Sequence, residues 1–104
     1  MNKYHAVRTY SALCGRTFDS KAEARRGEEL ALLERGGVIH ALQYQIKFLL
    51  SVKPRITITI DFQYIEQGIV RHEDTKGVLT RDFRTKLAWL KEKWGHDVIL
   101  VRNP

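Results

Sequence analysis

A chain of 104 residues with 43% hydrophobic and 29% charged residues has room for one globular domain, and no apolar run approaches the roughly 20 residues that cross a bilayer. The single cysteine, Cys14, excludes an internal disulfide and a cysteine-based zinc site, and the absence of an apolar block near residue 1 predicts a protein that stays in the cytoplasm. Lys and Arg number 18 against 12 Asp and Glu, and the formal net charge of +6 favours nucleic acid as a partner, although solubility alone also explains it.

Residues 1–17 show little periodicity, and we expect a basic, partly extended arm. The stretch FDSKAEARRGEELALLERGG then predicts a helix. Ser20 can cap its start, with Glu23 completing a capping box, and Gly36–Gly37 marks its end. Gly27 inside this helix either lets the sheet approach closely or weakens the helix.

The rest of the chain alternates between strand and helix patterns. Residues 38–50 and 56–76 have strand spacing, and the second range predicts a hairpin that turns at Gln67–Gly68. Thr80 can cap a helix that ends at Gly95, and DVILV supplies a final strand. The predicted order is helix, three strands, helix, strand. It indicates an α/β (α+β) domain over residues 18–104, with a mixed sheet of about four strands flanked by helices.

The predicted hairpin brings acidic residues together. A two-residue turn at Gln67–Gly68 places Asp61 directly opposite Asp74, and Lys76 lies on the same face as Asp74, whereas Glu73 points to the other face. Two opposed carboxylates beside one ammonium suit a hard divalent cation such as Mg²⁺. The alternative is that these are surface residues at a frayed strand end, where an exposed ion pair contributes little.

Three further side chains are candidates for the same site. Glu23 falls on the buried stripe of the first helix and can face the sheet as a third metal ligand, although the capping box alone also explains it. Gln45 and His72 are auxiliary candidates, with a solvated glutamine and a half-exposed strand histidine as the alternatives.

Basic side chains are candidates for contacts with the nucleic-acid backbone, in competition with ordinary solvation of charged surfaces. They lie in the arm and on the second helix: Lys3, Arg8, Arg16, Arg81, Arg84 and Lys86.

The segments FDSKAE, ITITIDFQYIEQGIVRHEDTKG and TKLAWLKEKWGHDVILV together resemble small phage-encoded proteins of the restriction-endonuclease-like PD-(D/E)XK superfamily, and within it the phage junction-resolving endonucleases. The resemblance spans residues 18–101. It implies that Glu23 is the helix carboxylate, Asp61 the aspartate of the first half-motif, and Asp74 with Lys76 the second half-motif. Ile60 departs from the pattern, which has proline at that position.

The resemblance implies Mg²⁺-dependent cleavage of DNA, with Mn²⁺ as a substitute, on branched substrates such as Holliday junctions in phage recombination or replication. Paired incisions require two active sites, so we expect a homodimer in the cytoplasm of the host cell. Two alternatives remain open. One is a basic DNA-binding protein without catalysis, and the other is a nicking or end-processing nuclease with a different substrate.

Overall fold

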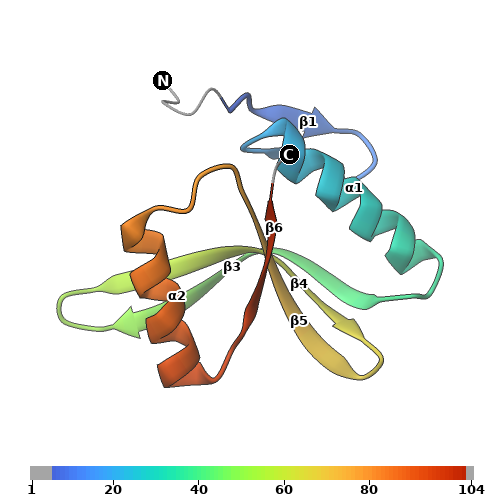
Figure 1. The fold of residues 1–104 in the computed structure, drawn as a ribbon. Helices are drawn as coiled ribbons and strands as arrows, with labels where there is room; N and C mark the ends of the chain where they lie inside the picture. Colours follow the sequence, from blue (N-terminus) through green and yellow to red (C-terminus); the bar gives the residue numbers. More distant parts are fainter. Residues whose placement is uncertain (1–5, 103–104) are drawn as a thin grey trace.

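Two helices, a four-stranded sheet and a two-stranded sheet make up residues 6–102, which are the residues that the computed structural model describes (Figure 1). The α+β class and the predicted order of helix, three strands, helix and strand are confirmed. No helix among these residues is long and apolar enough to cross a membrane. The elements are β1 (Thr9–Ser11), β2 (Arg16–Phe18), α1 (Lys21–Arg35), β3 (His40–Ser51), β4 (Ile56–Glu66), β5 (Ile69–Lys76), α2 (Arg81–Trp94) and β6 (Val98–Arg102).

Both helices begin and end as their capping residues predict. The Ser20 and Thr80 side chains accept hydrogen bonds from the backbone N–H of Glu23 and Phe83, at 3.1 and 3.2 Å. Gly95 ends α2 in the left-handed conformation, with φ of 74°, which glycine adopts without steric cost.

The four-stranded sheet has the order β3-β4-β5-β6 and is mixed. β3, β4 and β5 are antiparallel neighbours, and β6 returns parallel to β5 after α2. The turn at Gln67–Gly68 sets the predicted register, which runs from the pair Glu66–Ile69 to the pair Phe62–Glu73.

β4 and β5 separate beyond Phe62–Glu73, and we call this separation the fork. Towards its start β4 pairs only with β3, whereas β5 continues from Asp74 to Lys76 as a partner of β6. Asp61 and Asp74 stand where the two strands part. The fork opens a gap in the sheet without exposing a long unpaired edge on β5.

Two hydrophobic clusters lie on either side of the fork. One packs under α1 and contains Phe62, and the other packs under α2 and contains Ile60, although these residues are only two apart on β4. Gln45 of β3, with φ of 54°, interrupts the regular strand opposite this place. The sheet therefore bends between the two helices, which lie well apart in Figure 1.

The structure differs from the expected arm at residues 9–17. β1 and β2 form a small hairpin, and Ser11 is buried and donates to Glu28 of α1 at 2.7 Å. Phe18, which follows the predicted boundary, is only 1% exposed and joins the cluster under α1. The expectation overlooked that Ser11 and Phe18 fix both strands of this hairpin to the domain.

Gly27 lets Phe18 approach α1 closely. A Cβ at position 27 would lie 2.7 Å from Cζ of Phe18, whose ring also packs against Tyr44 and Phe62. A close approach at Gly27 is therefore confirmed, but the neighbour is Phe18 of the β1–β2 hairpin and not the four-stranded sheet.

We expect Gly27→Ala to lower the free energy of unfolding by about 1 to 2 kcal/mol, because overpacking against the confined Phe18 ring outweighs the gain of up to about 1 kcal/mol in helix propensity. The matched control is Gly36→Ala, where the added Cβ makes only ordinary contacts, and its stability should be unchanged or slightly higher. Urea denaturation measures both. A stabilised Gly27→Ala protein would contradict the packing role of Gly27.

Candidate functional site

An open cleft of about 820 Å³ lies in the fork. Its walls are the N-terminal ends of α1 and α2, and its floor is formed by β4 and β5. The lining residues include Ser20, Glu23, Asp61, Thr75, Lys76 and Phe83.

Asp61 and Asp74 meet at the base of the cleft, as the predicted register requires. Oδ1 of Asp74 accepts the backbone N–H of Asp61 at 2.9 Å, and Oδ2 of Asp61 accepts the backbone N–H of Thr75 at 2.8 Å. The two carboxylates thus satisfy backbone donors where the strands part, and both residues are buried. The alternative of two frayed surface residues is wrong.

Glu23 reaches the same place from α1. Its Oε2 accepts a hydrogen bond from Nε2 of Gln45 at 3.0 Å, and the same Nε2 lies 3.3 Å from Oδ1 of Asp61. Ser20 caps the helix through the Glu23 backbone N–H, while the Glu23 carboxylate is directed to the cleft. Gln45 therefore bridges two acidic side chains of the candidate site.

Lys76 lies beside Asp74, as the sequence predicted. Its Nζ is 3.2 Å from Oδ2 of Asp74 and 4.2 Å from the centre of the Phe83 ring of α2. The ammonium group is near enough to form an ion pair but does not meet hydrogen-bond geometry, so no donor among the described residues serves Oδ2. Asp74 is fully buried, and the ammonium of Lys76 is the charged neighbour of this oxygen.

The shared environment of the three acids favours their protonated forms. Burial, together with the charges of Asp74 and Glu23, raises the pKa of Asp61 to about 8. Burial also raises the pKa of Glu23 to about 7, with contributions from Asp19 and Asp74. The pKa of Asp74 is raised by burial too, although Lys76 opposes the rise. A bound cation would reverse this preference, because it stabilises the ionised carboxylates.

The oxygen donors fit a hard divalent cation. Within residues 6–102, no group of three or more His, Cys, Asp or Glu side chains is arranged to hold a metal ion by itself. Mg²⁺ does not require one, since it is commonly held by one or two carboxylates and keeps water or phosphate oxygens as its other ligands. Asp61 and Asp74, whose Oδ2 is ion-paired with Lys76, supply the two carboxylates of such a donor set. The Gln45 amide bridges Glu23 to Asp61.

An ion pair that the sequence did not predict connects the two sides of the site. Nε and Nη2 of Arg26 donate to the two carboxylate oxygens of Glu73, each at 2.8 Å, and the Tyr64 hydroxyl also donates to Glu73. Glu73 is 1% exposed. Arg26 is one helical turn beyond Glu23, and Glu73 precedes Asp74. The pair therefore sets the position of α1 relative to β5.

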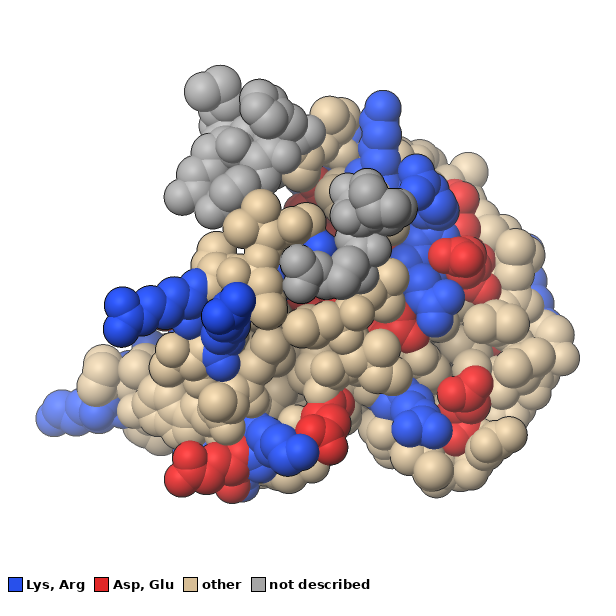
Figure 2. All heavy atoms as spheres, viewed as in Figure 1, with Lys and Arg blue, Asp and Glu red and all other residues tan. Residues whose placement is uncertain are grey.

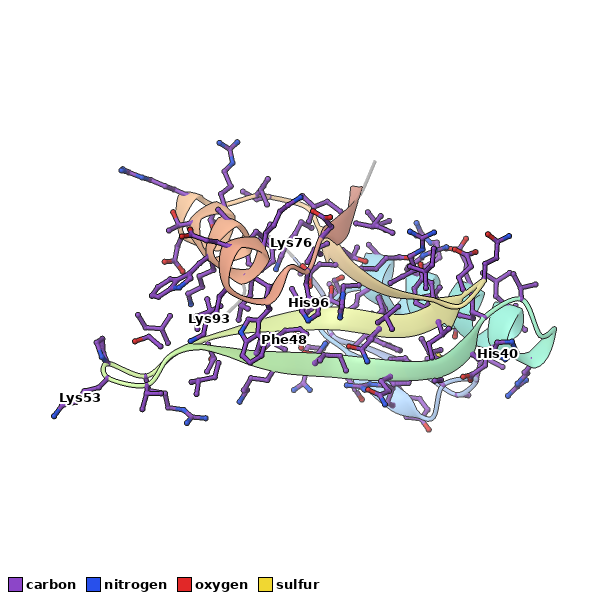
Figure 3. The ribbon with its side chains drawn as sticks, turned by 90° about the horizontal axis from the view of Figure 1, so that it is seen from below. His40, Phe48, Lys53, Lys76, Lys93 and His96 are labelled. Carbon is purple, nitrogen blue, oxygen red and sulfur yellow. The ribbon has the colours of Figure 1, made fainter. Side chains whose placement is uncertain are left out.

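The remaining predicted site residues lie elsewhere. His72 is buried, contacts Gln63 at 2.9 Å and packs against the rings of Phe48 and His96, which Figure 3 labels. Arg16 lies over the Tyr44 ring, 4.6 Å from its centre, rather than in a free arm. Lys3 lies outside the described residues.

The predicted basic side chains of α2 and Arg8 occupy the surface. Arg8, Arg81 and Arg84 are exposed, whereas Lys86 is half-buried, lines the cleft and lies 3.6 Å from Asp82. Figure 2 shows Lys and Arg side chains standing over α2. These positions are compatible with contacts to a ligand in the cleft.

The fold and the cleft define a small α+β protein with an acidic site in a divided sheet. A model of the family described as "Protein of unknown function (DUF1064)" matches residues 1–101, and the chain belongs to this family. No curated protein and no solved structure matches the chain. The chemistry of the cleft is therefore the basis for inferring a function.

We expect Arg26→Met to lower the free energy of unfolding by about 3 to 5 kcal/mol, because it leaves the buried Glu73 carboxylate without its charged partner. Glu73→Gln should cost less, about 1 to 3 kcal/mol, because Arg26 is half-buried and keeps Glu29 at 3.9 Å. The double variant should lose less than the sum of the two single losses. The exposed pair Lys91–Asp97 is the matched control, and Asp97→Asn should change stability by less than about 1 kcal/mol. If Glu73→Gln lowers the free energy of unfolding by no more than Asp97→Asn does, the Arg26–Glu73 pair does not anchor α1.

The raised pKa values also predict how stability depends on pH. Between about pH 5 and pH 8 the folded protein holds protons on Glu23 and Asp61 that the unfolded chain releases, so stability should fall as the pH rises. In EDTA, the melting temperature should drop by roughly 5 °C or more over this range. Mg²⁺ or Mn²⁺ should restore it, and more strongly at pH 8.5 than at pH 6, since the metal competes with protons.

The control for the pH experiment is Asp74→Asn, which should lose the response to metal. Differential scanning fluorimetry records both proteins. A wild-type melting temperature that ignores both metals at pH 8.5 would exclude the metal site.

Proposed function

We propose that this protein is a metal-dependent DNA endonuclease that hydrolyses phosphodiester bonds and selects branched DNA such as Holliday junctions. The observation that carries the proposal is the burial of Asp61, Asp74 and Glu23 beside Lys76 at the base of one open cleft. These side chains come from β4, β5 and α1. The site thus combines oxygen ligands for a cation with a positive charge for the phosphate.

Each residue has a distinct role in the proposed reaction. Asp61 and Asp74 would hold Mg²⁺ or Mn²⁺, with Glu23 as a third acidic ligand. A bound cation supplies Lewis-acid activation of water and neutralises the charge that develops on phosphate. The ammonium group of Lys76 also stabilises the negative charge that develops on phosphate. Its contacts with Asp74 and Phe83 fix the position of Nζ.

The surroundings of the cleft support a polyanionic substrate. The net charge of +6 and the exposed Arg81 and Arg84 at the start of α2 would attract and orient the sugar-phosphate backbone. Residues 6–102 form one such cleft. Paired cuts in a junction therefore need two copies, and the proposal includes a homodimer. We place the protein, as a phage-encoded enzyme, in the cytoplasm of the host cell.

The test is incubation with linear, nicked and four-way-junction DNA, with and without Mg²⁺. The proposal expects Mg²⁺-dependent cuts in the junction, and light scattering should show two copies on each junction. Binding without cuts under any condition would favour a DNA-binding protein, whereas cuts in nicked or linear DNA by a monomer would favour a nicking or end-processing nuclease.

Substitutions at the site should separate catalysis from binding. We expect Asp61→Asn and Asp74→Asn to lower the cleavage rate by about 1,000-fold or more, because they remove metal ligands. Both should bind DNA as tightly as the wild type or more tightly, since each removes a negative charge. Lys76→Ala should also cut slowly but still bind metal. Single-turnover cleavage and fluorescence anisotropy measure the two properties, and wild-type rates in either Asn variant would exclude the site.

Glu23→Gln keeps the helix start, since glutamine is equally suited to that position, so its melting temperature should not fall. Its cleavage rate should drop by at least about 10- to 100-fold, which is the loss typical for a residue that only supports a metal ligand, because the change removes a charged ligand. Glu29→Gln makes the same change in charge on an exposed part of α1 and should cut normally. Normal cleavage by Glu23→Gln would leave Glu23 outside the metal site.

A further inference from the structure

The connection between β3 and β4 is fully exposed and projects from the sheet. It consists of Val52, Lys53, Pro54 and Arg55, which we call the hairpin tip. Val52 is 75% exposed, the largest fraction among the exposed large hydrophobic residues of the described chain. Lys53 lies at the end of the hairpin and points away from the domain (Figure 3). Packing within the domain does not account for these four side chains.

α2 holds the hairpin just before the tip. Nζ of Lys93 donates to the Leu50 carbonyl at 3.0 Å, and Nε1 of Trp94 donates to the Leu49 carbonyl at 3.2 Å. These bonds occupy carbonyls of β3, which is an edge strand of the sheet. The tip is therefore presented at a defined place beside the end of α2.

The charge around the tip is mostly positive. The tip carries two cations and no acid, and α2 carries five Lys and Arg residues against two Asp and Glu. α1, in contrast, has four of each. Figure 2 shows Lys and Arg over α2, with Asp and Glu beside them at its lower end, whereas over α1 the two kinds of charge alternate. This distribution favours a polyanion along the α2 side.

The tip lies about 20 Å along β4 from the acidic site, since Arg55 and Asp61 are six residues apart at about 3.3 Å per residue. This length corresponds to about six base pairs of a duplex. A duplex arm that leaves the cleft along α2 would therefore reach the tip. Apolar side chains flanked by cations are the kind of wedge that enters the narrow minor groove, where both sugars and phosphates are close.

We infer that the hairpin tip is a second DNA-contact element, which grips the minor groove of the duplex that flanks the cleaved phosphate. Lys53 and Arg55 contact phosphates on the two sides of the groove, and Val52 and Pro54 contact its sugars and base edges. The inference rests on the proposed action on DNA. The hairpin tip is remote from the acidic site where cleavage is proposed, so an experiment can contradict the DNA contact at the tip without contradicting the cleavage, and the reverse.

The test compares the variant Lys53→Ala plus Arg55→Ala with the control Arg25→Ala plus Arg35→Ala, which removes the same charge from exposed positions of α1. Binding to a 24-base-pair duplex in EDTA is measured as a function of KCl. The slope of log Kd against log salt should become shallower by about 1.8 in the tip variant, because two phosphate contacts are lost, and should not change in the control. Val52→Ser should weaken binding about tenfold without changing the slope.

The same proteins are then assayed for Mg²⁺-dependent cleavage of a four-way junction at saturating protein concentration, where weaker binding does not limit the rate. Equal slopes in the tip variant and the control would overturn the inference, and normal cleavage by both would leave the proposed function standing. A shallower slope in the tip variant supports the inference, even if no protein cuts DNA and the proposed catalysis fails. Absence of DNA binding by the wild type would overturn both.

Discussion

The opposition of Asp61 and Asp74 across one hairpin is the constraint on which the rest of the structure depends. Two carboxylates cannot share a buried register position within an ordinary ladder, because their charges repel and their oxygens need donors. Here they accept the backbone N–H groups of Asp61 and Thr75, and β4 and β5 separate. The separation divides the core into two clusters and leaves a cleft between the ends of α1 and α2.

The candidate site also depends on α1, which must hold Glu23 at this cleft. Burial of Glu23 beside two other acids is unfavourable, and the Arg26–Glu73 pair, one helical turn further along α1, compensates by fixing α1 to β5. Side chains on opposite faces of β5 thus have different roles, one in holding α1 and the other in forming the candidate site. Glu73 anchors the helix, while Lys76 lines the cleft and Asp74 is buried next to Asp61. Stability and the candidate chemistry are therefore coupled through adjacent residues.

The sequence predicted the elements and the acidic residues because local rules determine both. Gln67–Gly68 sets the register that opposes Asp61 and Asp74, and Ser20, Thr80 and Gly95 mark the helix ends. The fork was not predictable, since regular alternation along β4 places Ile60 and Phe62 on one face. The Arg26–Glu73 pair and the contact of Phe18 with Gly27 depend on how α1 lies on the sheet, which spacing along the chain does not determine.

The parallel pairing of β5 with β6 has a consequence for folding during synthesis. β5 is made before α2 and β6, so its outer edge has no partner until the chain has been extended through both elements. An open edge is a template for aggregation, and charged side chains protect such edges. Arg71, Glu73, Asp74 and Lys76 make β5 a strongly charged strand. The charged residues of the candidate site and its anchor therefore also disfavour pairing of the open β5 edge with another chain before β6 has been synthesised.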